Sequence, residues 1–251
     1  MENVKAISSA GISLRLLAVS VSLILSLAAP CAADLIGPPP SWELPAIPTE
    51  TVSGHVTANN GFAWDYNYGI GYDGASVNIS VEIDFTGLVT QALKNLWEQG
   101  IESMWNGKYY LVKDDLYTIP ITFDVTTAGP FNYVVNVVAG PHPSNMTEWD
   151  TEDTGNVAAH EFGHMLGLFD EYPGGATDPG GPIIDPASIM GSTADGVTPF
   201  ARHFEPFRLW IAGHSPEETF RLERTPEPAT FVVAAIGLAL FAARRNRARP
   251  R

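Results

Sequence analysis

Cysteine and positive charge are both scarce in this sequence of 251 residues. Cys31 is the only cysteine, so no disulfide can form within the chain, and the class of small secreted domains held together by disulfides is excluded. Lys and Arg number 14 against 28 Asp and Glu, which gives a formal net charge of −14. Because phosphate backbones repel so acidic a surface, nucleic acid is excluded as a partner.

Long hydrophobic runs are missing as well, since no apolar run reaches the roughly 20 residues that a membrane-spanning helix needs. The run at 16–29 follows two basic residues and precedes small residues around Ala33. This order predicts a secretory signal peptide over 1–33, cut by signal peptidase near Ala33. A membrane anchor is the alternative for this segment. Pro30 argues against a lipid-modified Cys31, because small residues normally precede such a cysteine.

The other end of the chain carries Pro226-Glu227-Pro228, an apolar segment at 231–243 and then five arginines. This order resembles the PEP-CTERM sorting signal of bacteria that have an exosortase-type sorting enzyme. The resemblance implies that a short transmembrane helix lodges transiently in the inner membrane, with its arginines in the cytoplasm. Cleavage near the Pro-Glu-Pro motif would then send the exported protein to the cell surface, the extracellular matrix or the medium. A plain tail anchor is the alternative.

The segments between these two signals differ in composition. We expect a proline-rich leader at 34–50, which can neither complete a sheet ladder nor easily start a helix. A folded domain is predicted over 51–214 and a linker over 215–225, and the sorting signal then occupies 226–251. A domain of this size can bury one adequate core without disulfides.

The hydrophobic pattern of the domain alternates between strand and helix periods. Residues 77–83 alternate as a half-buried strand does, and apolar residues recur at helical spacing from 84 to 105. Strands are then predicted at 109–112, 117–125 and 131–138, and a C-terminal helix within 199–213. The fold class is therefore α+β, with a mixed twisted sheet, one long helix and a second helix around residue 160.

That second helix carries the densest group of metal-binding side chains. His160 and His164 are four residues apart, so on a helix both imidazoles project from one face and can reach one zinc ion. Glu161 is suited to take a proton from the water that zinc activates. Gly167 can end the helix in a left-handed conformation, and such a turn would bring Asp170 back toward the two histidines.

The spacing His-Glu-x-x-His-x-x-Gly-x-x-Asp over 160–170 resembles the zinc signature of metzincin proteases, in the variant with aspartate as third ligand, as in the snapalysin group. Met190, in Ser-Ile-Met-Gly, resembles the methionine turn that underlies the metal in that family. The resemblance implies a metzincin-like (zincin) fold with a small, mostly helical or irregular C-terminal subdomain. It also implies Zn2+ bound by His160, His164 and Asp170, with Glu161 as general base.

The third ligand stays open at this point, because Glu171, His203 and His214 are rivals of Asp170. The chain also lacks a tyrosine two residues after Met190, where some metzincins have a donor for the transition state, so the stabiliser of the oxyanion is open too.

These residues are compatible with two functions. One is an exported zinc endopeptidase acting on a protein or peptide substrate; the other is a non-catalytic surface or matrix module that keeps zinc for stability. Asp178 and Asp185 are candidate Ca2+ ligands in the loop after the helix, although turns at the two Asp-Pro pairs are the preferred interpretation.

Overall fold

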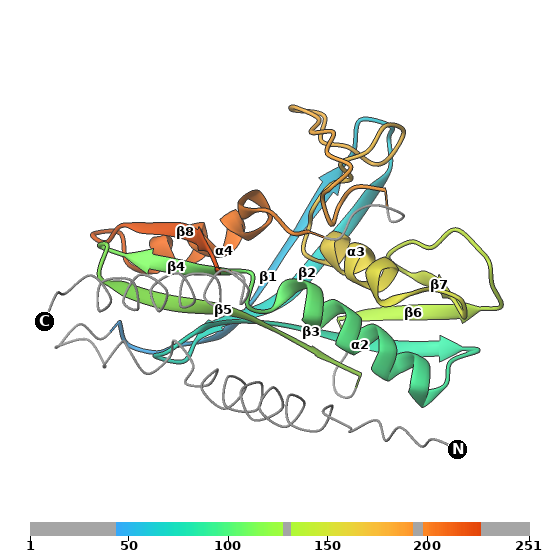
Figure 1. Ribbon diagram of the computed structural model, residues 1–251, viewed down its shortest axis with the longest axis horizontal. Coiled ribbons are helices and arrows are strands. Elements are labelled where there is room, and N and C mark those ends of the chain that lie inside the picture. Colours follow the sequence, from blue (N-terminus) through green and yellow to red (C-terminus); the bar gives the residue numbers. More distant parts are fainter. Residues whose placement is uncertain (1–43, 128–131, 193–197, 227–251) are drawn as a thin grey trace, which may run out of the picture. The chain divides into compact units, whose positions relative to one another are not determined.

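A computed structural model describes residues 44–127, 132–192 and 198–226 of the chain (Figure 1). The predicted signal peptide at 1–33 and the predicted transmembrane segment at 231–243 lie outside the described residues. Within the described part, no helix is long and apolar enough to cross a membrane.

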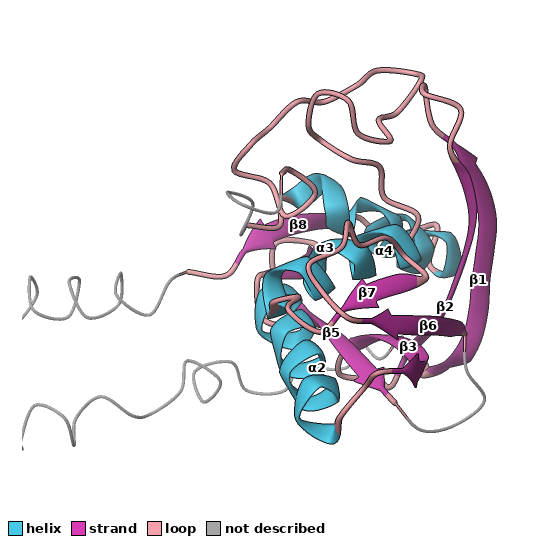
Figure 2. Cartoon of the chain, turned by 90° about the vertical axis from the view of Figure 1, so that its right-hand side faces the viewer, coloured by secondary structure: helices cyan, strands magenta, loops and turns pink. Residues whose placement is uncertain are grey.

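The unit Glu43–Thr225 is a mixed α+β fold built on one eight-stranded sheet, which confirms the predicted α+β class, whereas the metzincin-like form of that fold stays a prediction. The strands follow the order β1-β2-β3-β5-β4-β8, and β6 pairs with β3 and with β7. The sheet curls, and α2, α3 and α4 lie inside the curl (Figure 2). The strands are β1 Ile47–Thr57, β2 Ala63–Tyr72, β3 Val77–Gly87, β4 Tyr109–Lys113, β5 Tyr117–Thr126, β6 Tyr133–Val138, β7 Glu148–Asp150 and β8 Phe220–Arg224, and the helices are α2 Gln91–Trp105, α3 Gly155–Met165 and α4 Ala201–His214.

The start of the long helix differs from the prediction. Residues 84–87 continue strand β3, because Phe85 is buried and pairs with Val135 of β6. Helix α2 begins only after Thr90, whose hydroxyl accepts a hydrogen bond from the backbone N–H of Leu93. The alternation of buried and more exposed side chains in β3 therefore continues into residues 84–87, where the sequence pattern predicted the start of a helix.

The predicted domain limits of 51–214 are too narrow at both ends. Strand β1 begins at Ile47, inside the segment expected to be a leader at 34–50. The expected linker at 215–225 contains β8, which pairs with β4 and buries Phe220. Buried and exposed side chains do not alternate along β8, so its sequence does not indicate a strand. Only its hydrogen bonds to β4 identify it.

Helix α2 fixes the position of α3 through its buried tryptophans. The Nε1–H of Trp97 donates to the carbonyl of Asp153, and that of Trp105 donates to the carbonyl of Ala159. Between these two contacts the helices meet at Gly100 and Gly155, where neither side has room for a side chain. The positions of Trp97, Gly100 and Trp105 along α2 thus determine how deeply α3 lies in the core.

This close approach leads to a stability prediction. A Cβ on Gly100 would lie 2.8 Å from the carbonyl oxygen of Gly155, so Gly100→Ala is expected to lower the free energy of unfolding by about 1 to 3 kcal/mol. Gly213→Ala in α4 is the matched control, because nothing lies within 4 Å of its added Cβ. There alanine should stabilise the helix by up to about 1 kcal/mol. Urea unfolding followed by tryptophan fluorescence measures both, and equal effects would contradict the packing argument.

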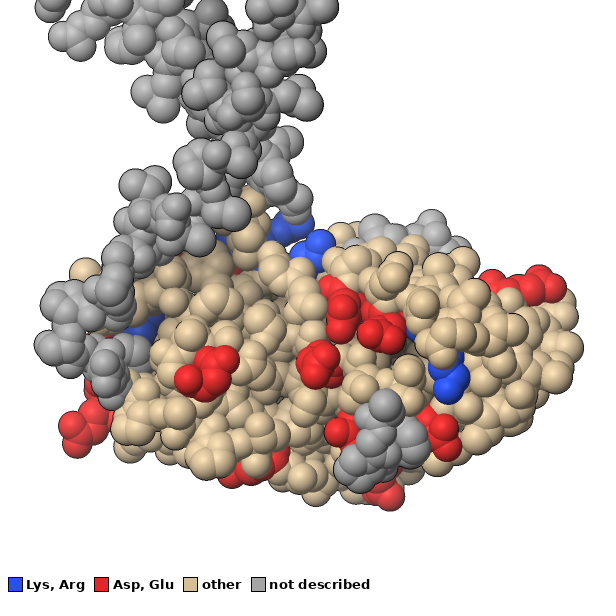
Figure 3. Space-filling view, turned by 90° about the horizontal axis from the view of Figure 1, so that it is seen from below, with Lys and Arg blue, Asp and Glu red and all other residues tan. Residues whose placement is uncertain are grey.

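The acidic composition is visible on the surface. Figure 3 shows a face on which Asp and Glu side chains outnumber Lys and Arg. Several basic side chains are held by acidic neighbours, as in the pairs of Arg208 with Glu205 and of Arg221 with Asp115. The described surface therefore keeps the acidic character of the sequence.

Candidate metal centre

Helix α3 presents both histidines on one face, as the four-residue spacing predicts. The imidazole centroids of His160 and His164 lie 5.0 Å apart. The opposite face of the helix buries apolar residues, so the histidines cannot rotate away without exposing the core. These buried residues are Ala158, Ala159, Phe162 and Met165.

The turn at Gly167 brings the chain back toward this face. Gly167 has a φ of +86°, and a Cβ there would lie 2.8 Å from the ring of Tyr66, so both conformation and packing require glycine. The N–H of Gly167 donates to the carbonyl of His164, and the N–H of Leu168 donates to that of Gly163. The helix ends here, and Asp170 returns to the histidines.

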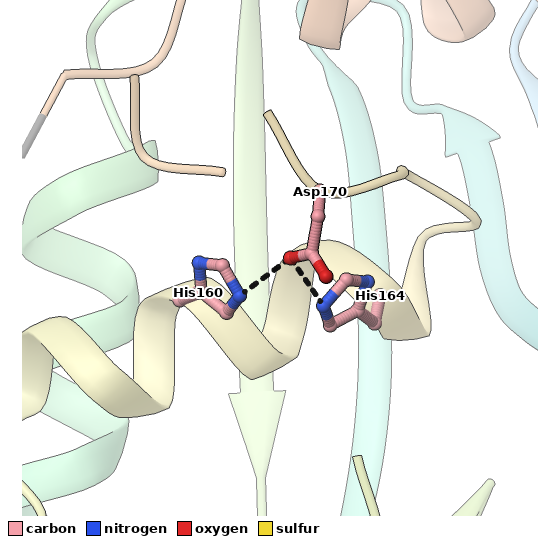
Figure 4. A group of neighbouring side chains, drawn as sticks. All are labelled: His160, His164 and Asp170. Carbon is pink, nitrogen blue, oxygen red and sulfur yellow. Dashed lines mark ion pairs between the residues drawn. The ribbon is translucent and has the colours of Figure 1, made fainter. Parts of the chain in front are cut away.

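Three side-chain atoms converge at this point (Figure 4). The Oδ1 atom of Asp170 lies 3.1 Å from Nε2 of His160 and 3.3 Å from Nε2 of His164. In the described part of the chain, these three residues form the one group of three or more His, Cys, Asp or Glu that can hold a metal ion. Glu171, His203 and His214 do not belong to it.

Backbone carbonyls determine which imidazole nitrogens carry protons. Nδ1 of His160 lies 3.0 Å from the carbonyl oxygen of Ile189, and Nδ1 of His164 lies 2.8 Å from that of Leu168. Because a carbonyl only accepts, both Nδ1 atoms are donors, and the neutral rings then turn Nε2 lone pairs toward Asp170. Backbone acceptors of this kind are typical partners of metal-binding histidines.

This donor set fits a zinc ion. Oδ1 of Asp170 is buried and accepts no hydrogen bond, although two nitrogens lie close to it. Three lone pairs facing one another require a cation between them, either a proton or a metal ion. Ligand atoms around a tetrahedral zinc lie about 3.3 to 3.5 Å apart, close to the distances found here.

The pKa shifts of these side chains also favour a bound cation. Burial opposes a charge on His164, but the adjacent carboxylate of Asp170 outweighs it and raises the pKa of the imidazole. Burial would raise the pKa of Asp170, yet its contacts with His160 and His164 hold that pKa below the ordinary value. Asp170 is therefore ionised and the pocket favours a positive charge. Burial raises the pKa of Glu161, which lies on the same helix.

Met190 lies against α3, as expected for a residue beneath the site. A Cβ on Gly163 would overlap the sulfur of Met190, so the two pack without a gap. The backbone around Met190 also holds the ligand segments: the carbonyl of Ile189 accepts from His160, and that of Met190 accepts the N–H of Glu171 at 2.7 Å.

Glu171 and His203 interact with each other and are not available to a metal ion. Arg202 donates to both carboxylate oxygens of Glu171, and His203 Nε2 lies 3.1 Å from one of them. Nδ1 of His203 accepts the N–H of Phe200, so Nε2 carries the proton and donates. Burial would raise the pKa of Glu171, but the hydrogen bonds from Arg202 and His203 lower it to about 2.

The remaining alternative ligands lie away from the two histidines. His214 is at the C-terminal end of α4, where it contacts Trp210 and Glu50. Asp178 accepts the N–H of Gly180, and Asp185 accepts that of Ala187, so both expected Ca2+ candidates hold local turns. The structure does not bring these two aspartates into a metal-binding group.

Tyr172 is a residue that the sequence analysis missed. Its ring centroid lies 6.2 Å from that of His160, and the negative charge of Asp170 acts on its hydroxyl. Burial raises the pKa of Tyr172 to about 12, so the hydroxyl stays protonated at neutral pH. The signal for such a donor in the sequence is a tyrosine two residues beyond Asp170, and not one after Met190.

The comparisons with known proteins bear on the end of the chain. Residues 224–247 match the PEP-CTERM protein-sorting motif. This match confirms the predicted sorting signal and implies an exported protein that an exosortase-type enzyme recognises and that is sorted to the cell surface. No curated protein and no solved structure matches the chain. The resemblance of 160–170 to metzincin proteases therefore stays a prediction.

Two hollows of different size lie near these elements. The larger, of about 580 Å³, lies between α4 and β8 and has none of the three converging residues in its wall. The smaller, of about 160 Å³, is lined by Asp170, Glu171, Asp178 and Ile183, among others. Asp170 is the only one of the three converging residues in that wall, so this hollow borders the candidate site on the side of Glu171 and His203.

Proposed function

We propose that this chain is an exported zinc-dependent endopeptidase whose metal is held by His160, His164 and Asp170. One observation carries the proposal: the Nε2 atoms of His160 and His164 both face the same buried oxygen of Asp170, at 3.1 and 3.3 Å, and both Nδ1 atoms already donate to the backbone. Zinc held there would supply the Lewis acidity that polarises a peptide carbonyl and makes water a nucleophile at neutral pH.

The other roles fall to side chains around this group. Glu161 is buried beside the two histidines, and burial raises its pKa toward the range that suits proton transfer. It would take a proton from the attacking water and pass it to the leaving amine. The protonated hydroxyl of Tyr172 is the candidate donor for the oxyanion that forms on the attacked carbonyl. Met190 supports the helix from beneath.

Removal of the metal tests the proposal directly. The full chain, purified with its zinc content measured, is expected to hold about one zinc ion and to hydrolyse casein. Dialysis against 1,10-phenanthroline should abolish hydrolysis, and added Zn2+ should restore it. Zinc binding without any hydrolysis of casein or a peptide library would contradict the proposal and favour the non-catalytic surface or matrix module.

A further inference from the structure

The β1–β2 hairpin contacts the second histidine of the candidate site from outside α3. The Nε1–H of Trp64, in β2, donates to the carbonyl of His164 at 3.0 Å. The indole ring also meets the His164 imidazole edge-on, with centroids 5.3 Å apart, and packs against Phe169 at 5.6 Å. Trp64 thus touches both the backbone and the ring of His164, and the segment that leads to Asp170.

Two neighbours of Trp64 support the same end of the helix. The hydroxyl of Tyr133 accepts the N–H of Asn67 and donates to the carbonyl of Met165 at 2.8 Å. The ring of Tyr66 packs over Gly167. The last carbonyls of a helix have no partner inside the helix. Here Trp64 adds a second donor to the carbonyl of His164, which also accepts the N–H of Gly167, and Tyr133 supplies the donor for the carbonyl of Met165.

The tip of the hairpin holds the segment that orients Asp170. The N–H of Asn59 donates to the carbonyl of Thr177, and the side-chain amide of Asn60 donates to that of Gly175. Between these residues, the N–H of Ala176 donates to Oδ2 of Asp170 at 2.6 Å. One hairpin therefore reaches two of the three candidate ligands, and Figure 2 shows it rising beside the helices toward these loops.

We propose that the β1–β2 hairpin is a positioning element of the zinc site, with Trp64 as the positioning residue for His164 and Asn60 as the positioning residue for the Asp170 loop. The inference rests on the proposed zinc site. Groups that orient metal ligands from a second layer typically change metal affinity by about 10- to 100-fold when they are removed. The hairpin acts on the ligands and need not touch the substrate.

Substitution of Trp64 tests this with the full chain. Trp64→Phe keeps an aromatic ring beside His164 but removes the Nε1–H donor. We expect the Zn2+ affinity, measured by competition with a chromogenic chelator, to fall on the order of tenfold. The visible absorption of the Co2+-loaded protein should change as well, because it reports the geometry of the ligands.

Trp210→Phe is the matched control, since it also removes an indole hydrogen bond of a half-buried tryptophan, the one to the carboxylate of Glu50, outside the site. Its Zn2+ affinity and Co2+ spectrum should equal those of the unaltered protein. Equal losses in both variants, or an unchanged affinity in Trp64→Phe, would overturn the inference and leave the proposed function standing. An unaltered protein that binds no Zn2+ would overturn both.

A second pair of substitutions at the hairpin tip keeps the test decisive if Trp64→Phe does not fold. Asn60→Ala removes the side-chain bond to Gly175, whereas Asn59→Ala leaves its backbone bond to Thr177 in place. Asn60→Ala is expected to lower Zn2+ affinity severalfold, and Asn59→Ala should leave it unchanged. The same affinity in both variants would contradict a role for the tip.

Discussion

Replacement of Glu161 by glutamine is expected to lower the kcat of peptide hydrolysis by about 10²- to 10⁴-fold while the zinc content stays unchanged. Glutamine keeps the size of this buried side chain but cannot accept a proton from water. Because Glu161 does not belong to the converging group of ligands, its charge is not needed to retain the metal. Rates on a fluorogenic peptide, together with the zinc content of the same sample, measure both quantities.

Glu217→Gln provides the control for this substitution. Glu217 is exposed, so its replacement should alter neither the rate nor the zinc content. A Glu161→Gln variant that retains full activity would refute a proton-transfer role. A variant that loses its zinc would instead assign Glu161 to the binding of the metal.

Asp170→Asn is expected to lower zinc affinity by well over the roughly 100-fold that loss of an outer partner costs. The substitution keeps an oxygen that can accept the N–H of Ala176, so the loop should remain in place. It removes the negative charge that faces the two histidines, and a neutral amide is a much weaker zinc ligand. Chelator competition measures the affinity, and casein hydrolysis at saturating Zn2+ shows whether activity survives.

His203→Ala is the informative comparison, because His203 was the nearest histidine alternative. Its loss leaves Glu171 paired with Arg202 but leaves the N–H of Phe200 without its acceptor. We expect the free energy of unfolding to fall by about 1 to 3 kcal/mol, with zinc affinity unchanged. A loss of zinc in His203→Ala together with retention in Asp170→Asn would show that the ligand assignment is wrong.

The local part of the candidate site followed from spacing alone. His160 and His164 share a face because helical geometry places every fourth residue there. Gly167 adopts its positive φ because only glycine does so without strain. Asp170 then lies within reach because only two residues separate it from Gly167. These are short-range consequences of the sequence, and the structure agrees with each of them.

The elements of the fold were predictable where one face of the element is buried. The alternation of β3 and the apolar face of α2 both appear in the sequence. The junction at 84–90 and the strand at Phe220–Arg224 were not predicted correctly, because they depend on pairing with β6 and β4. Pairing between residues far apart in the sequence leaves no local period.

By itself, the sequence determined the α+β class, the exported character implied by the sorting motif, and the order of His160, Glu161, His164 and Asp170. Only the tertiary structure decided that Asp170 lies with the histidines while Glu171 pairs with Arg202 and His203. The same holds for Trp64, which contacts His164 although it lies 100 positions earlier in the sequence. The reason is physical: adjacent residues such as Asp170 and Glu171 have similar chemistry, and only the surrounding fold determines which carboxylate finds a partner and which is left for a cation.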